Sequence, residues 1–238
     1  MRIGKEHLLL AFCFNFCALP ITQGQVPSEP AAKIQPMRLL FVEDQRDRGV
    51  LLTDEGEAIK PSAGAQTSAP PSGVSVGARD AERRKKASEL LAAGQVISAQ
   101  DFHDAAFIFQ HGQSPDDFLL AHILAVEAIV KGDASSKWIA AATLDRYLQA
   151  IGQKQVFGTQ YLDNSFLYFL QHRNDADLGE KIKAVPKGTT QQPYNDQLMP
   201  DALRADFCVP ELKRQIEAVQ AANTSKDHSL VIPLGCAR

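Results

Sequence analysis

The chain has 238 residues and a formal net charge of −3 at pH 7, and 45% of its residues are hydrophobic. This length suits one generous domain or two small ones. A mildly acidic protein has no general electrostatic attraction for nucleic acids or anionic lipids, so the strongly basic classes of binding protein are excluded. One basic run, Arg83 to Lys86, has acidic residues beside it. We interpret that run as a solvated helix face.

Residues 1–24 have the pattern of a secretory signal peptide. Arg2 and Lys5 form a positive region, residues 8–21 are almost wholly apolar, and Gly24 offers a small residue for cleavage. The apolar run is short for a membrane span, so no stable span is expected after cleavage, although an uncleaved anchor is the alternative. The sequence therefore predicts a secreted or periplasmic protein whose mature chain has a formal charge of −4.

Two of the four cysteines, Cys208 and Cys236, remain after cleavage of the signal peptide. An even pair in a compartment that permits oxidation predicts a disulfide. A loop of this size would contribute on the order of 3–4 kcal/mol if the bond is unstrained. Two free thiols are the alternative.

The mature chain divides by composition into a leader, a linker and a helical domain. The leader, residues 25–59, contains one predicted short helix over residues 37–50. Residues 60–78 are rich in Pro, Gly, Ser and Ala. Such a composition buries too little apolar surface to offset its ordering entropy, so we predict a flexible linker there. The helical domain covers residues 79–223, and residues 224–238 form a tail.

Apolar residues at helical spacing predict four helices in the first part of this domain. Ser98 and Asp101 resemble a capping box, and Pro115 lies in a first turn where its missing N–H costs nothing. The third helix is apolar nearly all round, which predicts a central position. Short connections favour antiparallel neighbours. The predicted helices cover residues 80–93, 98–111, 115–130 and 136–151.

The pattern changes after Gln155. Aromatic and β-branched residues predict a β-hairpin near residues 156–170. A long polar loop over residues 173–200 and a final helix over residues 211–222 follow. The predicted fold is therefore mainly α, an antiparallel helical bundle or an array of helical hairpins with a small β-hairpin.

The sequence contains none of the strong catalytic, nucleotide-binding or metal-binding signatures. The histidines do not lie at metal-ligand spacing, so no metal and no cofactor are predicted. Two polar residues in apolar helix patterns are the first candidates. His111 could act as a base, or it could donate a hydrogen bond to a free carbonyl at a helix end. Asp145 lies on an apolar stripe and needs a partner, since an unpaired buried charge is very costly.

The candidate partners of Asp145 are Arg48 and the loop over residues 155–160. Arg146 is adjacent to Asp145 but points about 100° away around the helix. Either Asp145 is a buried polar clamp that fixes how the loop docks, or it is a carboxylate positioned in a pocket.

Three short motifs resemble those of a family of uncharacterised bacterial proteins, a domain of unknown function. They are the sequence FQHG at residues 109–112, a helix with Trp138 and the pair Asp145–Arg146, and the sequence QVFGTQ at residues 155–160. A D-Q-x-x-R element precedes them. The resemblance implies a polar cluster beneath the helices but no known activity. Its members would be Asp44, Gln45, Arg48, Gln110, His111, Asp145, Gln155, Thr159 and Gln160.

Two functions fit this sequence. The favoured hypothesis is a non-catalytic module that binds another envelope or secreted protein, or a peptide, on a helical groove. The alternative is a hydrolase in which His111 is the general base, Asp145 orients it, and Arg146 or Gln160 stabilises charge. An exposed groove with apolar anchors would support the first function. A pocket with His111 and Asp145 within hydrogen-bond reach would support the second.

Overall fold

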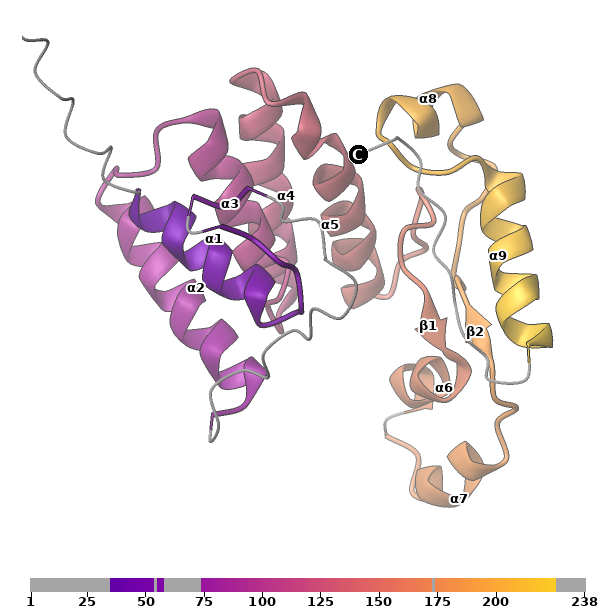
Figure 1. Cartoon of the computed structure of the whole chain (residues 1–238). Coiled ribbons are helices and arrows are strands. Elements are labelled where there is room, and N and C mark those ends of the chain that lie inside the picture. The colour runs from indigo at the N-terminus through magenta and orange to yellow at the C-terminus, as the bar shows by residue number, and fades with distance from the viewer. Residues whose placement is uncertain (1–34, 54, 58–73, 173, 226–238) are drawn as a thin grey trace, which may run out of the picture. The chain divides into compact units, whose positions relative to one another are not determined.

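The computed structural model describes residues 35–53, 55–57, 74–172 and 174–225 (Figure 1). Within these residues the fold is mainly α with a small antiparallel sheet, which confirms the predicted class. The predicted signal peptide, most of the predicted linker, and Cys236 lie outside the described residues. None of the helices in the described ranges is long and apolar enough to cross a membrane.

Helix α1 covers Pro36–Arg46 and helix α2 covers Val76–Ala92. The side chain of Ser75 accepts a hydrogen bond from the backbone N–H of Ala78, so α2 begins before residue 79, inside the segment predicted as linker. A partly buried ion pair attaches α1 to helix α3 (Ala99–Phe109): Arg38 Nη1 lies 2.9 Å from Asp104 Oδ1. The same guanidinium donates to the carbonyls of Glu55 and Gly56.

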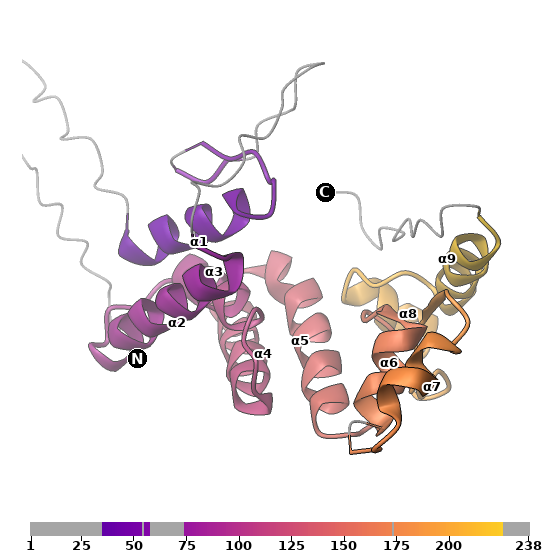
Figure 2. The same cartoon turned by 90° about the horizontal axis from the view of Figure 1, so that it is seen from below.

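Helices α3 (Ala99–Phe109), α4 (Pro115–Val130) and α5 (Lys137–Ala150) lie side by side in that order (Figures 1 and 2). Capping boxes begin both α3 and α4, and the predicted box of Ser98 with Asp101 is confirmed. A 3₁₀ turn at Ala134–Ser136 leads into α5. Small side chains permit the close packing of the three helices. The alanines that are fully buried on them are Ala105, Ala106, Ala121, Ala125, Ala128, Ala140 and Ala141.

Helix α4 has the predicted central position between α3 and α5, but it is not enclosed on all sides. Its alanine face packs against α3 and α5, and its opposite face carries Ile123, Val126 and Val130, which are 54%, 41% and 74% exposed. These three residues recur at helical spacing and form an apolar stripe. An apolar composition therefore did not distinguish a buried helix from one with an exposed apolar face.

The C-terminal part differs from the prediction in its details. Strand β1 (Leu162–Asp163) pairs antiparallel with β2 (Thr189–Thr190), so the sheet is present but its second strand is far along the chain. Residues predicted to complete a hairpin form helix α6, Asn164–His172. Asp163 Oδ1 accepts hydrogen bonds from the N–H groups of Ser165 and Phe166, which caps this helix and explains why helix forms there.

The segment predicted as a long polar loop, residues 173–200, contains helix α7 (Leu178–Lys183) as well as β2. Helix α8 (Asp201–Asp206) was not predicted. The predicted final helix is confirmed as α9, Leu212–Thr224, and it lies beside β2 (Figure 1).

Candidate functional site

Asp145 is a buried clamp for the loop that follows α5. Its Oδ1 accepts hydrogen bonds from the N–H groups of Val156 and Phe157 at 2.8 and 3.0 Å. Its Oδ2 accepts from the N–H and the Oγ1 hydroxyl of Thr159 at 2.9 and 2.8 Å. Burial raises the pKa of Asp145, and the hydrogen bonds from the loop oppose that rise. Of the two predicted partners, the loop is the correct one.

Amide side chains complete the docking of this loop, residues 155–160. Gln155, which is fully buried, donates to the carbonyls of Gln160 and Gln191 and accepts from the N–H of Gln160. Gln160 in turn donates to the carbonyl of Ala142 on α5. An amide offers both donors and acceptors, so it satisfies buried backbone groups well. The predicted residues Gln155, Thr159 and Gln160 therefore stabilise the loop itself.

The sequence did not predict three further residues of the same network. Gln191 donates to the carbonyl of Gly158, Gln215 donates to the carbonyls of Phe157 and Pro210, and Tyr194 donates to the carbonyl of Phe157. Gln191 lies in a polar segment and Gln215 in an ordinary helix pattern, so nothing in the sequence indicated that either amide would be buried.

A second polar cluster joins α1 to α2; we call it the ion cluster, and it consists of Asp44, Asp47, Arg48, Arg79, Asp80 and Arg83. Arg48 lies 2.8 Å from Asp44 and 2.9 Å from Asp80. Arg83 lies 2.7 Å from Asp47 and 2.6 Å from Asp80. Burial raises the pKa of Asp44 to about 6, against the opposing effect of Arg48 and Arg83. The element Asp44–Gln45–Arg48 therefore belongs to this cluster, where Gln45 donates to Asp44.

The burial of Arg83 contradicts the interpretation of residues 83–86 as a solvated helix face. It belongs to the basic run that predicted a solvated face, yet it is only 4% exposed. Asp80 and Ala87 lie three and four residues away on the same face of α2, and both are buried. An acid, a base and an alanine at this spacing were the available signal for a buried ion pair.

The C-terminal end of α3 lies between the ion cluster and α5. Arg84 donates to the carbonyl of His111 at 2.7 Å, and Arg146 donates to the carbonyl of Gln110 at 3.0 Å. These carbonyls have no partner within the helix, and positive charge is favourable at a helix C-terminus. His111 does not take the capping role considered for it. Its Nε2 is buried without a hydrogen bond, 3.5 Å from Asp44 Oδ2.

The structure therefore separates the predicted site residues into two groups. Asp44, Gln45, Arg48, Gln110, His111 and Arg146 lie at or beside the ion cluster, while Asp145, Gln155, Thr159 and Gln160 form the loop clamp. Although Asp145 and Arg146 are adjacent in sequence, they serve different groups. Among the described residues, no hydrogen bond or ion pair joins His111 to Asp145. The pairing on which the hydrolase hypothesis rested is absent from this part of the chain.

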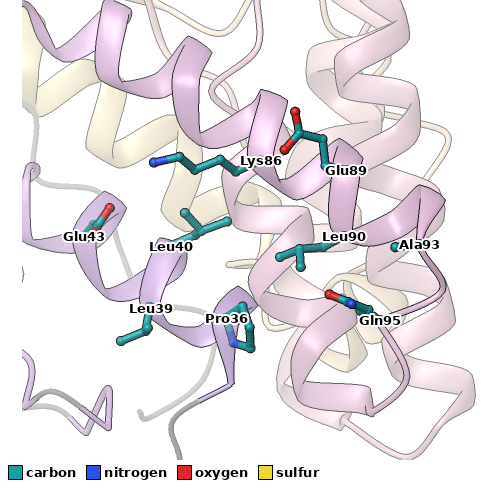
Figure 3. A pocket seen from close by; sticks show the side chains of 9 residues that line it. All are labelled: Pro36, Leu39, Leu40, Glu43, Lys86, Glu89, Leu90, Ala93 and Gln95. Atoms are coloured by element: carbon teal, nitrogen blue, oxygen red, sulfur yellow. The ribbon is translucent and has the colours of Figure 1, made fainter.

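A groove lies between α1 and α2, with a volume of about 510 Å³. Leu40 from α1 and Leu90 from α2 face each other across it (Figure 3). Charged side chains stand at its edges, and Leu39, which also lines it, is 43% exposed. The lining residues are Pro36, Leu39, Leu40, Glu43, Lys86, Glu89, Leu90, Ala93 and Gln95.

Comparisons of the chain with protein families, with curated proteins and with solved structures give no match. The resemblance to an uncharacterised bacterial family stays a prediction. The predicted disulfide also stays a prediction, because Cys236 lies outside the described residues.

Proposed function

We propose that this protein is an exported, non-catalytic binding module that holds a segment of another protein, or a peptide, in the groove between α1 and α2. The groove itself carries the proposal. Grooves between helices that are lined by leucine and edged by charge are a recurring site for amphipathic peptide segments. Leu39 and Leu90 supply apolar surface on both of the helices that border it.

The edges of the groove specify the chemistry of the ligand. Among the residues that line the groove, Glu43 and Glu89 are acidic and Lys86 alone is basic, so the lining has an excess of negative charge. A segment with leucine or phenylalanine anchors and a neighbouring lysine or arginine complements this arrangement. The apolar anchors contribute most of the affinity, and the basic residue sets the orientation of the segment.

The hydrolase is the less favoured function because its proposed groups have structural partners. Asp145 accepts four hydrogen bonds from the loop, and Gln160 donates to α5. Burial, together with the charges of Arg48 and Arg146, lowers the pKa of His111 to about 3. A general base works best with a pKa near the operating pH, so His111 is poorly suited to that role at neutral pH.

A peptide selection tests the binding function. A displayed library of random 15-residue peptides would be selected against the full chain, and the recovered peptides measured by fluorescence polarisation. Peptides with apolar anchors and a basic residue are expected, and Leu39→Glu should weaken them at least tenfold. Ile123→Glu is the matched control, since Ile123 is also exposed but lies on α4. No recovered peptide, or equal binding to both variants, would contradict the proposal.

Export is a separate part of the proposal and rests on residues 1–24. Expression of the full chain in a bacterial host with an intact export pathway should yield periplasmic protein that begins at Gln25. Mass spectrometry of the periplasmic fraction measures this directly. An uncleaved cytoplasmic chain would contradict export but leave the binding function open.

A further inference from the structure

The apolar stripe of α4 is the largest group of exposed apolar side chains on one helix in the described part of the chain; we call Ile123, Val126 and Val130 the α4 stripe. The opposite face of the helix, with Ala121 and Ala125, packs against α3 and α5 (Figure 2). Single exposed apolar residues are normal on any surface, whereas a contiguous row of them marks a site of interaction.

Helix formation alone does not explain the residues of the α4 stripe. Ile and Val have lower helix propensities than Ala, Lys or Glu, because their branched Cβ restricts the side chain against the preceding turn. A position that only faces water is better filled by a residue such as Glu127 or Lys131, which form an ion pair on the flank of the stripe. β-branched apolar residues at the exposed positions instead favour a face that packs against another surface.

The spacing of the stripe matches a contact with another helix. Leu119, which is partly exposed, precedes Ile123 by four residues, Val126 follows three later, and Val130 four later. This alternation of four and three is the heptad spacing of the a and d positions, whose side chains insert between side chains of a facing helix. The stripe therefore fits a helix better than an extended peptide.

Charges at the two ends of α4 indicate which helix fits. Asp116, in the first turn, is exposed and has no ion pair among the described residues. Lys131 follows the last turn, and its side chain is 36% exposed. At 100° per residue, both lie on the same side of the stripe. That side borders α3, because the Lys131 ammonium lies 5.4 Å from the centroid of the Phe102 ring.

An antiparallel second copy of α4 complements both ends. When two copies pack stripe to stripe about a two-fold axis, the same flank of each helix comes together. With the axis midway between Ile123 and Val126, Ile123 of one copy faces Val126 of the other. Asp116 of each copy then lies within about one helical turn of Lys131 of the other, and the two helix dipoles oppose each other. A parallel pair would place like charges together at both ends.

We propose that the α4 stripe is a homodimer interface in which two copies of α4 pack antiparallel about a two-fold axis. A single pair of helices of this length buries on the order of 400 Å² per copy, about half of the ~800 Å² per partner of a standard interface. The dimer is therefore weak, with a dissociation constant of about 100 μM. The interface shares no residue with the α1/α2 groove, so the dimer does not rest on the proposed binding function.

Sedimentation velocity tests the dimer, with protein purified after expression of the full sequence. As the concentration rises from about 5 to about 500 μM, the share of chains in dimers should rise from about a tenth to about three quarters. A chain that stays monomeric at about 500 μM would overturn the proposal. A stripe that binds only a different protein would give that monomeric result.

Two isoleucine variants locate the interface. Ile123→Glu places two carboxylates in the centre of the apolar contact, so it should raise the dissociation constant at least tenfold. Ile216→Glu is the matched control, because Ile216 is also a partly exposed isoleucine, 43% exposed, but lies on α9. Equal dimerisation of the two variants would place the interface elsewhere and overturn the proposal.

Charge reversals test the antiparallel arrangement without disturbing the apolar contact. Asp116→Lys and Lys131→Glu should each weaken the dimer about fivefold, since each change brings like charges together twice across the two-fold axis. The two changes in one chain restore opposite charges at both ends, so the double variant should dimerise about as well as the wild type. Circular dichroism confirms that each variant is folded. A double variant weaker than both single variants would contradict the antiparallel pairing.

Discussion

Replacement of Asp145 by Asn tests whether the loop clamp is structural. The carboxylate uses both oxygens: Oδ1 accepts from Val156 and Phe157, and Oδ2 accepts from the N–H and hydroxyl of Thr159. Asn has the same shape but replaces one oxygen by an NH₂ group, which cannot accept. Whichever way the amide is oriented, two of the four donors lose their acceptor, and a donor then faces a donor.

The size of the effect follows from this count. Each lost hydrogen bond to a charged group is worth about 1.5–3 kcal/mol, and a buried N–H left without a partner adds a cost of its own. The substitution also relieves the burial of a charge, whose cost is evident in the raised pKa of Asp145. The two effects oppose each other, and the net loss in the free energy of unfolding should be about 3 kcal/mol.

Urea denaturation followed by circular dichroism measures this loss, with Asp116→Asn as the control. Asp116 is exposed on the first turn of α4, so its variant should stay within about 0.5 kcal/mol of the wild type. Amide hydrogen exchange should accelerate at Val156, Phe157 and Thr159. A loss below 1 kcal/mol for Asp145→Asn, or exchange unchanged at these amides, would refute the assignment of a clamp and favour a carboxylate reserved for a ligand.

Three further changes have defined outcomes. Gly158 has φ of +80°, and an added Cβ would lie 2.6 Å from the Tyr194 hydroxyl, so Gly158→Ala should cost about 3 kcal/mol in thermal melting. Gly152 has a similar φ of +74° but open space around it, so Gly152→Ala should cost only about 1 kcal/mol from backbone strain. Equal costs for the two variants would show that the contact of the added Cβ with Tyr194 contributes nothing. The pKa of His111 is lowered to about 3, so its neutral form contributes stability that is complete above pH 6.5 and falls as the pH drops toward 3. Between pH 7 and pH 5 the wild type should therefore lose about 2 kcal/mol more than His111→Gln in urea melts, and parallel losses would contradict this. Ala121 is fully buried, so Ala121→Leu should overpack the helices and lower the free energy of unfolding by about 2 kcal/mol. An unchanged free energy of unfolding would indicate unfilled space around Ala121.

Local signals explain why the helices of the first part were predictable. Ser98 with Asp101, Pro115, and Gly94 with φ of +66° act within one turn of the helix ends that they define. Such signals are complete in a short window of sequence, and α3, α4 and α5 each ended within two residues of the prediction. The clamp at Asp145 was predictable for a related reason, since an acid on an apolar stripe must have a partner.

The rest depends on contacts between distant residues. Strand β1 has its partner in β2 at Thr189–Thr190, and no local pattern specified that pairing. The aromatic residues of α6 are equally compatible with a strand or a helix, and the cap from Asp163 decided between them. Arg83 and Gln215 are buried because of partners more than 30 residues away, Asp47 and Phe157.

Because of the amide network, the stability of the C-terminal part should depend on temperature differently from that of the alanine-packed helices. In the described residues from Gln155 onward, buried polar side chains are nearly as numerous as buried apolar ones. Unfolding there exposes amides more than hydrocarbon, and polar exposure lowers the heat-capacity change that apolar exposure raises. On cooling, the helices α3 to α5 should therefore lose stability faster than the part that Asp145 attaches to them. The buried side chains in question are Gln155, Phe157, Gln191, Tyr194, Arg204, Val209, Pro210, Gln215 and Ala222.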